Sequence, residues 1–139
     1  MRRLALSAAA ALVCGCATVK RLDGSRCAPV REGCEPVSAV HIMNTNWMLL
    51  SFIPIASGDP QHPNEKSCLW FRDTVTLRNQ MVMLESEVRR AGASRAENVF
   101  TECNSESVFV FLLQREKMHT SAVLVKDVEP PAQEGAPAQ

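Results

Sequence analysis

The clearest structural signal in this chain of 139 residues is the sequence LRNQMVMLESEVRRAG at positions 77–92. Apolar side chains recur there at intervals of four and three residues, a spacing that places them on one face of an α-helix. Asp73 or Thr74 can cap its start, and Gly92 ends it. The segment therefore predicts an amphipathic helix that covers one face of a sheet. The apolar face consists of Leu77, Met81, Leu84, Val88 and Ala91.

Strand-forming sequence lies on both sides of this helix. Before it, residues 37–43 and 47–55 predict two strands, with a turn at 44–46; the second is apolar on both faces, as in a buried central strand. After it, three further strands are predicted at residues 97–103, 107–114 and 121–126, the first two joined by a turn at Asn104 and Ser105. This order predicts an α+β domain: a small, mainly antiparallel sheet of four or five strands with one amphipathic helix packed on it.

The first 15 residues have the layout of a secretory signal peptide. Arg2 and Arg3 supply a basic start, a short apolar stretch follows, and Gly15 is a small residue at the expected cleavage site. A membrane-spanning helix is the alternative, but it needs roughly 20 apolar residues, about twice the length of this stretch.

The sequence Leu12-Val13-Cys14-Gly15-Cys16 also resembles the lipobox of bacterial lipoproteins. The resemblance implies cleavage before Cys16, a thioether-linked diacylglycerol on its sulfur, and acylation of its new amino group. Cys14 fits this role less well, because Val13 would then occupy the position before the cut, where a small residue is required. Ala17 is not the aspartate that retains enteric-type lipoproteins in the inner membrane. The resemblance thus implies an outer-membrane location facing the periplasm.

These observations divide the chain into four parts. They are a signal peptide at residues 1–15, a lipidated polar tether at 16–36, a globular α+β domain at 37–127, and a disordered tail at 128–139. Removal of Arg2 and Arg3 with the signal leaves 13 basic and 15 acidic residues, a formal charge of −2. A chain without a basic surplus is not expected to bind nucleic acid.

Four cysteines would remain after lipidation of Cys16, namely Cys27, Cys34, Cys68 and Cys103. In an oxidising compartment they suggest two disulfides with three possible connectivities, of which Cys27–Cys34 and Cys68–Cys103 are favoured. Free thiols, a redox pair or a zinc site are alternatives. The six residues between Cys27 and Cys34 fit neither thioredoxin-type nor zinc-ribbon spacing.

No motif for catalysis or cofactor binding is present, and we expect neither an enzyme nor a bound metal. Ser94 lies in a sequence similar to a nucleophile elbow, but the final glycine is missing and a helix precedes it. The three histidines, His41, His62 and His119, share no ligand spacing with one another or with other candidate ligands.

Two functions remain as hypotheses. The first is a lipid-anchored envelope protein that acts as a structural or protein-interaction module, with the membrane and an unidentified envelope protein as partners. The second is a small-ligand or metal-binding lipoprotein that uses Asp59 and His62 in the long loop at residues 58–66. Trp70 and Phe71 beside this loop are interpreted as core residues, or alternatively as an apolar contact surface.

The run at residues 47–60, followed by a helix, strands and a short tail, also resembles small bacterial lipoproteins of the TRL-like kind. This resemblance implies no activity.

Overall fold

Helix α2 (Leu77–Ala91) forms where the apolar spacing predicts it, in a computed structural model that describes residues 16–24, 30–109 and 112–128. Its cap is Thr76, whose hydroxyl accepts a hydrogen bond from the Asn79 backbone N–H at 3.3 Å. The prediction of Asp73 or Thr74 as the cap was therefore wrong by at least two residues, because Thr74 hydrogen-bonds the sheet instead. Gly92 ends the helix with a positive φ of 66°.

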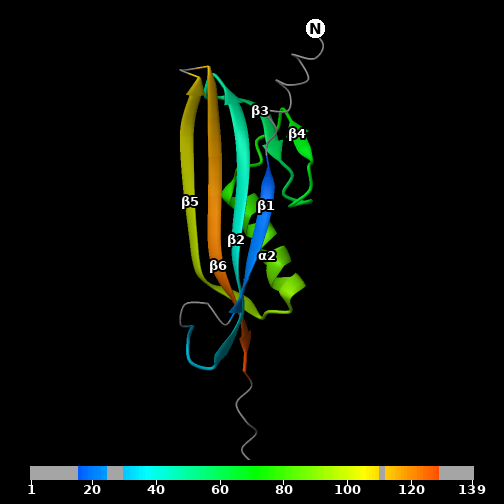
Figure 1. The fold of residues 1–139 in the computed structure, drawn as a ribbon, viewed down its shortest axis with the longest axis vertical. Coiled ribbons are helices and arrows are strands. Elements are labelled where there is room, and N and C mark those ends of the chain that lie inside the picture. The colour runs from blue at the N-terminus through cyan, green and yellow to red at the C-terminus, as the bar shows by residue number, and fades with distance from the viewer. Residues whose placement is uncertain (1–15, 25–29, 110–111, 129–139) are drawn as a thin grey trace, which may run out of the picture.

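The described strands form one antiparallel sheet, and α2 covers one of its faces (Figure 1). Strand β2 is central, with β6 and then β5 on one side and β3 and then β4 on the other. Strand β1 pairs with the lower part of β2, on the same side as β3. The strands are β1 (Ala17–Asp23), β2 (Cys34–Leu49), β3 (Ile53–Gly58), β4 (Cys68–Trp70), β5 (Arg95–Phe109) and β6 (Leu113–Asp127).

The α+β prediction is confirmed, but the sheet has six strands rather than four or five. One additional strand, β1, lies within the segment expected to be a polar tether, and residues 34–36 of that segment begin β2. The sequence of β1 reads as polar because only one of its faces is buried. Ala17 and Val19 pack on the core side, while Lys20 and Leu22, which alternate with them along the strand, are exposed. The other additional strand, β4, has only three residues.

Two predicted turns lie inside continuous strands. Residues 44–46 continue β2, where Asn44 is fully buried and its side-chain amide donates to the Thr74 carbonyl at 2.8 Å. Asn104 and Ser105 lie within β5. Conversely, the apolar run at residues 47–55 is not one strand. It contains the β2–β3 turn, which is formed by Leu50 and Ser51, both with positive φ. Leu50 is not a usual turn former, and a single serine within an apolar run does not mark a turn, so composition does not reveal this one.

The core lies between α2 and the central strands. Ile42 and Leu124 are completely buried there and face Met83 and Leu84 of the helix. A polar interaction also joins the two layers, since Arg21 of β1 donates to the carboxylate of Glu87, which is only 3% exposed. A buried carboxylate requires such a partner. These contacts fix β1 against both the sheet and the helix.

The sheet is long and narrow, and its two ends differ. The β2–β3 and β5–β6 turns lie together at the upper end in Figure 1, whereas the end of α2, the start of β2 and the end of β6 lie at the lower end. None of the helices in the described part of the chain is long and apolar enough to cross a membrane. The predicted signal peptide and most of the predicted tail lie outside the described residues.

Candidate functional site

Cys16, the predicted lipidation site, lies directly at the start of β1. Its side chain is exposed, while its carbonyl accepts a hydrogen bond from the Thr45 backbone N–H at 2.9 Å. The next residue, Ala17, is 2% exposed, and its carbonyl accepts from the Asn64 N–H at 2.8 Å. The backbone is therefore held to β2 and to the loop after β3 from the first residue of the predicted mature chain.

The start of β1 also meets the end of β3. Ala17 pairs with Asn44 on β2, and Ser57 pairs with Asn46 on the same side of that strand. Gly58 lies where the two segments converge, and a Cβ at this position would overlap the Ala17 nitrogen and the Cys16 carbonyl carbon. Only glycine allows this close backbone approach. The position of Cys16 thus depends on a glycine 42 residues further along the chain.

The Cys68–Cys103 disulfide prediction was wrong. Cys68 belongs to β4 and Cys103 to β5, which are the opposite edge strands of the sheet. Four strand spacings of about 4.8 Å separate them by roughly 19 Å, whereas a disulfide requires Cα atoms within about 7 Å. No two described cysteines lie at disulfide distance. Cys27 lies outside the described residues, so Cys27–Cys34 stays a prediction.

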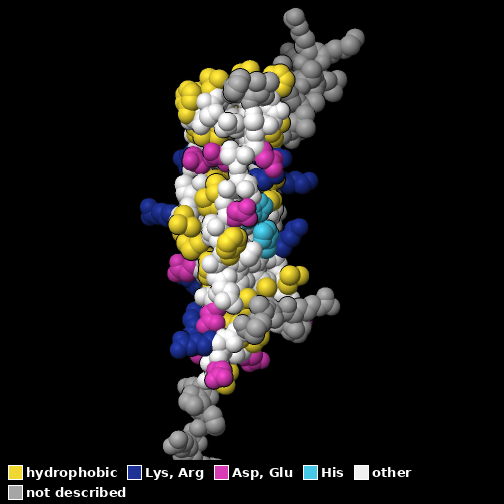
Figure 2. Space-filling model, turned by 90° about the vertical axis from the view of Figure 1, so that its left-hand side faces the viewer, with side chains coloured by type: hydrophobic (Ala, Val, Ile, Leu, Met, Phe, Trp, Pro, Cys, Tyr) yellow, Lys and Arg dark blue, Asp and Glu magenta, His cyan; other side chains and the backbone are white. Residues whose placement is uncertain are grey.

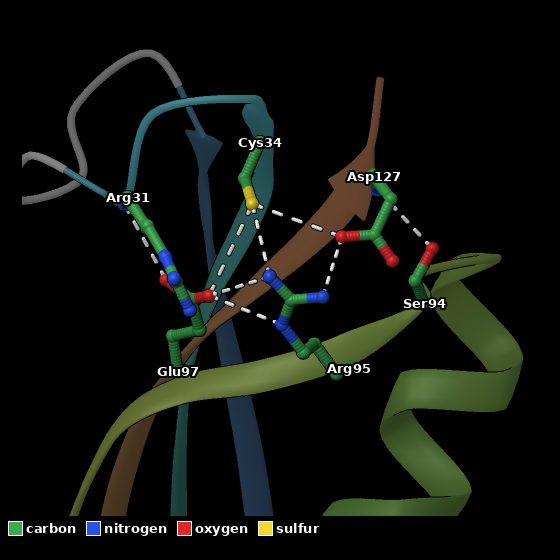
Figure 3. Close-up of polar contacts among 6 residues, drawn as sticks. All are labelled: Arg31, Cys34, Ser94, Arg95, Glu97 and Asp127. Carbon is green, nitrogen blue, oxygen red and sulfur yellow. Dashed lines mark hydrogen bonds and ion pairs between the residues drawn. The ribbon is translucent and has the colours of Figure 1, made fainter. Parts of the chain in front are cut away.

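Cys34 lies in a polar cluster at the lower end of the sheet (Figure 3). The guanidinium of Arg95 is central to it, with Nη2 at 3.0 Å from the Cys34 sulfur and ion pairs to Glu97 and Asp127. Ser94 accepts from the Asp127 backbone N–H at 3.2 Å. The cluster joins β2, β5 and β6, and it gives Ser94 a structural role. Sequence reasoning missed Arg95, because nothing in its neighbourhood marks a partner 61 residues away.

The loop after β3 brings Asp59 and His62 together, as the ligand-binding hypothesis required. The two side chains form an ion pair with 2.9 Å between Nδ1 and the carboxylate. Burial alone would raise the pKa of Asp59, but hydrogen bonds from His62 and from the Gln61 backbone outweigh it and lower this pKa. The hydrogen bond to Asp59 raises the pKa of His62. Each shift favours the charged form of its own group.

Replacing Asp59 by asparagine is expected to lower the pKa of His62 towards its ordinary value of about 6.5, because the negative charge that stabilises the imidazolium is lost. An NMR titration of the imidazole signals measures this shift. His41, on β2, serves as the internal control and should titrate as before. An unchanged His62 pKa would show that the pair does not form in solution.

A polar groove of about 620 Å³ adjoins this loop. Its lining includes Asp59 and Gln61 from the loop, Arg72 and Asp73, and Arg78 in the first turn of α2. His62 is not among its lining residues. The carboxylates of Asp59 and Asp73 balance the charges of the two guanidinium groups in this lining. The guanidinium groups and the nearby start of the helix are the features that can bind a small anionic ligand.

The other two histidines meet on the face of the sheet away from α2. His41 and His119 stack with ring centroids 5.4 Å apart, on the neighbouring strands β2 and β6. Desolvation lowers the pKa of His41, and so do the nearby His119 and Lys20. Within the described residues, no three His, Cys, Asp or Glu side chains are placed to hold a metal ion together.

Trp70 and Phe71 are not core residues. Trp70 is 49% exposed and Phe71 is 75% exposed, so the interpretation as core was wrong and the alternative of an apolar contact surface describes them. The short strand β4 is at the edge of the sheet, where no other described strand pairs with its outer side. Phe71 is held there with a positive φ of 56° by a hydrogen bond from its N–H to the Ile55 carbonyl.

Comparison of the chain with protein-family models, curated proteins and solved structures finds no significant match.

Proposed function

We propose that the protein is a lipid-anchored component of the cell envelope whose sheet domain acts as a structural or protein-interaction module at the membrane surface. The mature chain would begin at lipidated Cys16, in the outer membrane and facing the periplasm. The observation that carries the proposal is the placement of Cys16, which is exposed at its side chain and hydrogen-bonded at its backbone to the central strand.

This placement has a mechanical consequence for an anchored protein. A lipid on Cys16 would join the membrane to a strand of the sheet without an intervening flexible linker. The domain would then be held close to the bilayer in a restricted orientation. From the level of Thr45, beside Cys16, to the lower end at Cys34, β2 extends for about 37 Å. A partner would therefore be bound within roughly this distance of the membrane.

Replacing Cys16 by serine is expected to abolish lipid labelling and to remove essentially all of the protein from the membrane fraction in its mature form, because stable anchoring requires the acyl chains. Cells supplied with labelled palmitate and then fractionated provide the measurement. The matched control is Cys34→Ser, which should label as the native protein does. Equal labelling of the Cys16→Ser chain would refute the lipidation site.

Cross-linking of the native protein in intact cells tests the interaction role. One reproducible envelope protein, captured by the native chain and lost with Cys16→Ser, would identify the partner. Recovery of bulk envelope proteins alone would favour the second candidate function.

That candidate is the binding of a small anionic ligand in the polar groove, and the presence of Arg72 and Arg78 in its lining, beside the carboxylates of Asp59 and Asp73, supports it. Thermal unfolding in the presence of phosphate and of citrate tests it. A rise in melting temperature that Arg72→Gln removes would support this function, and no rise with either anion would dismiss it.

A further inference from the structure

The upper end of the sheet is formed by two hairpins that carry no charge. Residues 47–58 contain the β2–β3 hairpin and residues 107–114 contain the β5–β6 turn, and neither run includes Asp, Glu, Lys or Arg. A hydrogen bond of 2.9 Å from the Leu50 N–H to the Leu112 carbonyl joins the two turns. Two uncharged segments that are 60 residues apart in the sequence thus form one end of the molecule.

This end exposes large apolar side chains, which we call the tip patch. Figure 2 shows hydrophobic side chains gathered at the upper end of the molecule, with charged side chains beginning below them. A soluble monomer rarely exposes so many large apolar groups in one place, and such patches mark interaction surfaces. The tip patch consists of Leu50, Phe52, Ile53, Val108, Phe109 and Leu112.

We propose that the tip patch inserts into the lipid–water interface of the same bilayer that holds the Cys16 anchor. The inference rests on the proposed function for the anchor, and it adds a second, independent contact with lipid. Interfacial insertion of this kind typically buries apolar side chains by about 5–10 Å.

The direction of β1 supports lipid as the occupant. Because β1 is antiparallel to β2, Ala17 lies beside Asn44 and Cys16 lies beside Thr45, closer to the tip patch. Moving back along β1 towards the anchor is therefore moving towards the tip. A bilayer that holds lipid attached to Cys16 lies on the side of the molecule where the tip patch is.

The positions of the tip patch, of Cys16 and of the tryptophans along the strands agree with the thickness of the layers of a bilayer. Trp47 and Trp70 lie on one row across β2, β3 and β4, and Arg115 continues that row on β6, with its guanidinium 5.6 Å from the Trp47 ring. Of the two tryptophans, Trp70 is 49% exposed and accessible to lipid, whereas Trp47 is buried. Tryptophan and basic residues are common at the boundary between headgroups and hydrocarbon. The tip at Leu50 extends about 10 Å beyond this row. Cys16 lies about 7 Å on the other side of it, within the thickness of about 5–8 Å that headgroups occupy.

Three backbone donors among the described residues of the tip are paired, as a lipid environment requires, because unpaired polar groups are costly there. Besides the bond from Leu50, the Phe52 N–H donates to the Leu49 carbonyl and the Leu112 N–H donates to the Phe109 carbonyl. The turns therefore satisfy these donors within the protein.

Tryptophan placed at the tip provides a direct test. Phe52→Trp introduces a reporter into the tip patch, and Phe100→Trp introduces a matched reporter on β5, since the two phenylalanines are 69% and 66% exposed. The gene is expressed with its full sequence, and the mature lipidated protein is purified from membranes and reconstituted into phosphatidylcholine vesicles with brominated or ordinary acyl chains. Emission is compared with that of the parent protein to remove the signal of Trp47 and Trp70.

The added emission of Phe52→Trp should be quenched at least threefold more strongly by brominated lipid than that of Phe100→Trp. Flotation of the same vesicles reports the anchor separately. Protein that floats without selective quenching at position 52 would overturn the insertion and leave the anchor intact, as would a tip that binds a second copy or another protein. If the protein isolated from membranes carries no lipid on Cys16 and still shows selective quenching at position 52, the tip patch would be supported and the anchor refuted. If that protein carries no lipid on Cys16 and does not float with the vesicles, both the anchor and the insertion of the tip patch would be refuted.

Discussion

Replacing Ile42 by alanine is expected to lower the free energy of unfolding by about 3–4 kcal/mol. Ile42 is completely buried at the centre of β2, where it packs against α2 together with Leu124. The substitution removes three methyl or methylene groups and leaves a cavity that a long, hydrogen-bonded strand cannot close by moving. Urea denaturation followed by circular dichroism measures the loss.

The control for Ile42→Ala is Val82→Ala on the outer side of α2. Val82 is 51% exposed, so its truncation should change stability by no more than about 0.5 kcal/mol. Similar losses for the two variants would mean that the helix does not pack on this face of the sheet.

Replacing Gly58 by alanine is expected to cost about 2–3 kcal/mol and to release the start of β1 from the sheet. The new Cβ would overlap the backbone of Cys16 and Ala17 and come within 2.7 Å of the Asn44 amide oxygen. Because backbone atoms on both sides are held by hydrogen bonds, the overlap cannot be relieved by a side-chain rotation. Denaturation measures the cost, and faster limited proteolysis between residues 16 and 20 would report the release.

Gly33→Ala is the matched control for Gly58→Ala. Gly33 has a positive φ of 83°, but a Cβ there meets nothing within 4 Å. Backbone strain alone should cost about 1 kcal/mol and should leave proteolysis near Cys16 unchanged. If Gly58→Ala cost no more than Gly33→Ala, the close approach of β3 to Cys16 would be contradicted.

The helix was predictable from sequence because its apolar spacing and its glycine stop agree. Its buried face was predicted only in part: Leu84 is buried, whereas Leu77 is 57% exposed and Met83, Gln80 and Glu87 are buried instead. Strand β1 was not predictable, since Lys20 and Arg21 give a short one-sided strand the composition of a linker. The β2–β3 turn was hidden for the opposite reason. Leu50 and Ser51 continue an apolar run, and the contact of Leu50 with the Leu112 carbonyl, 62 residues further along the chain, is not visible in the local sequence.

The candidate site was predictable in its chemistry but not in its geometry. The lipobox resemblance marks Cys16, but only the pairing of β1 with β2 shows that this residue adjoins folded backbone. Likewise, the uncharged runs at residues 47–58 and 107–114 are visible in the sequence, and the strand register brings them to one end. The favoured pairing of Cys68 with Cys103 failed because sheet order, which spacing does not encode, separates β4 from β5.

The most direct test of the proposed membrane anchoring is mass spectrometry of the N-terminal peptide of the native protein, extracted from membranes with detergent. The proposal predicts a chain that begins at Cys16, with a diacylglyceryl thioether on its sulfur and an acyl group on its amino nitrogen. A chain that retains the Gly15–Cys16 bond, or an unmodified Cys16, would contradict it.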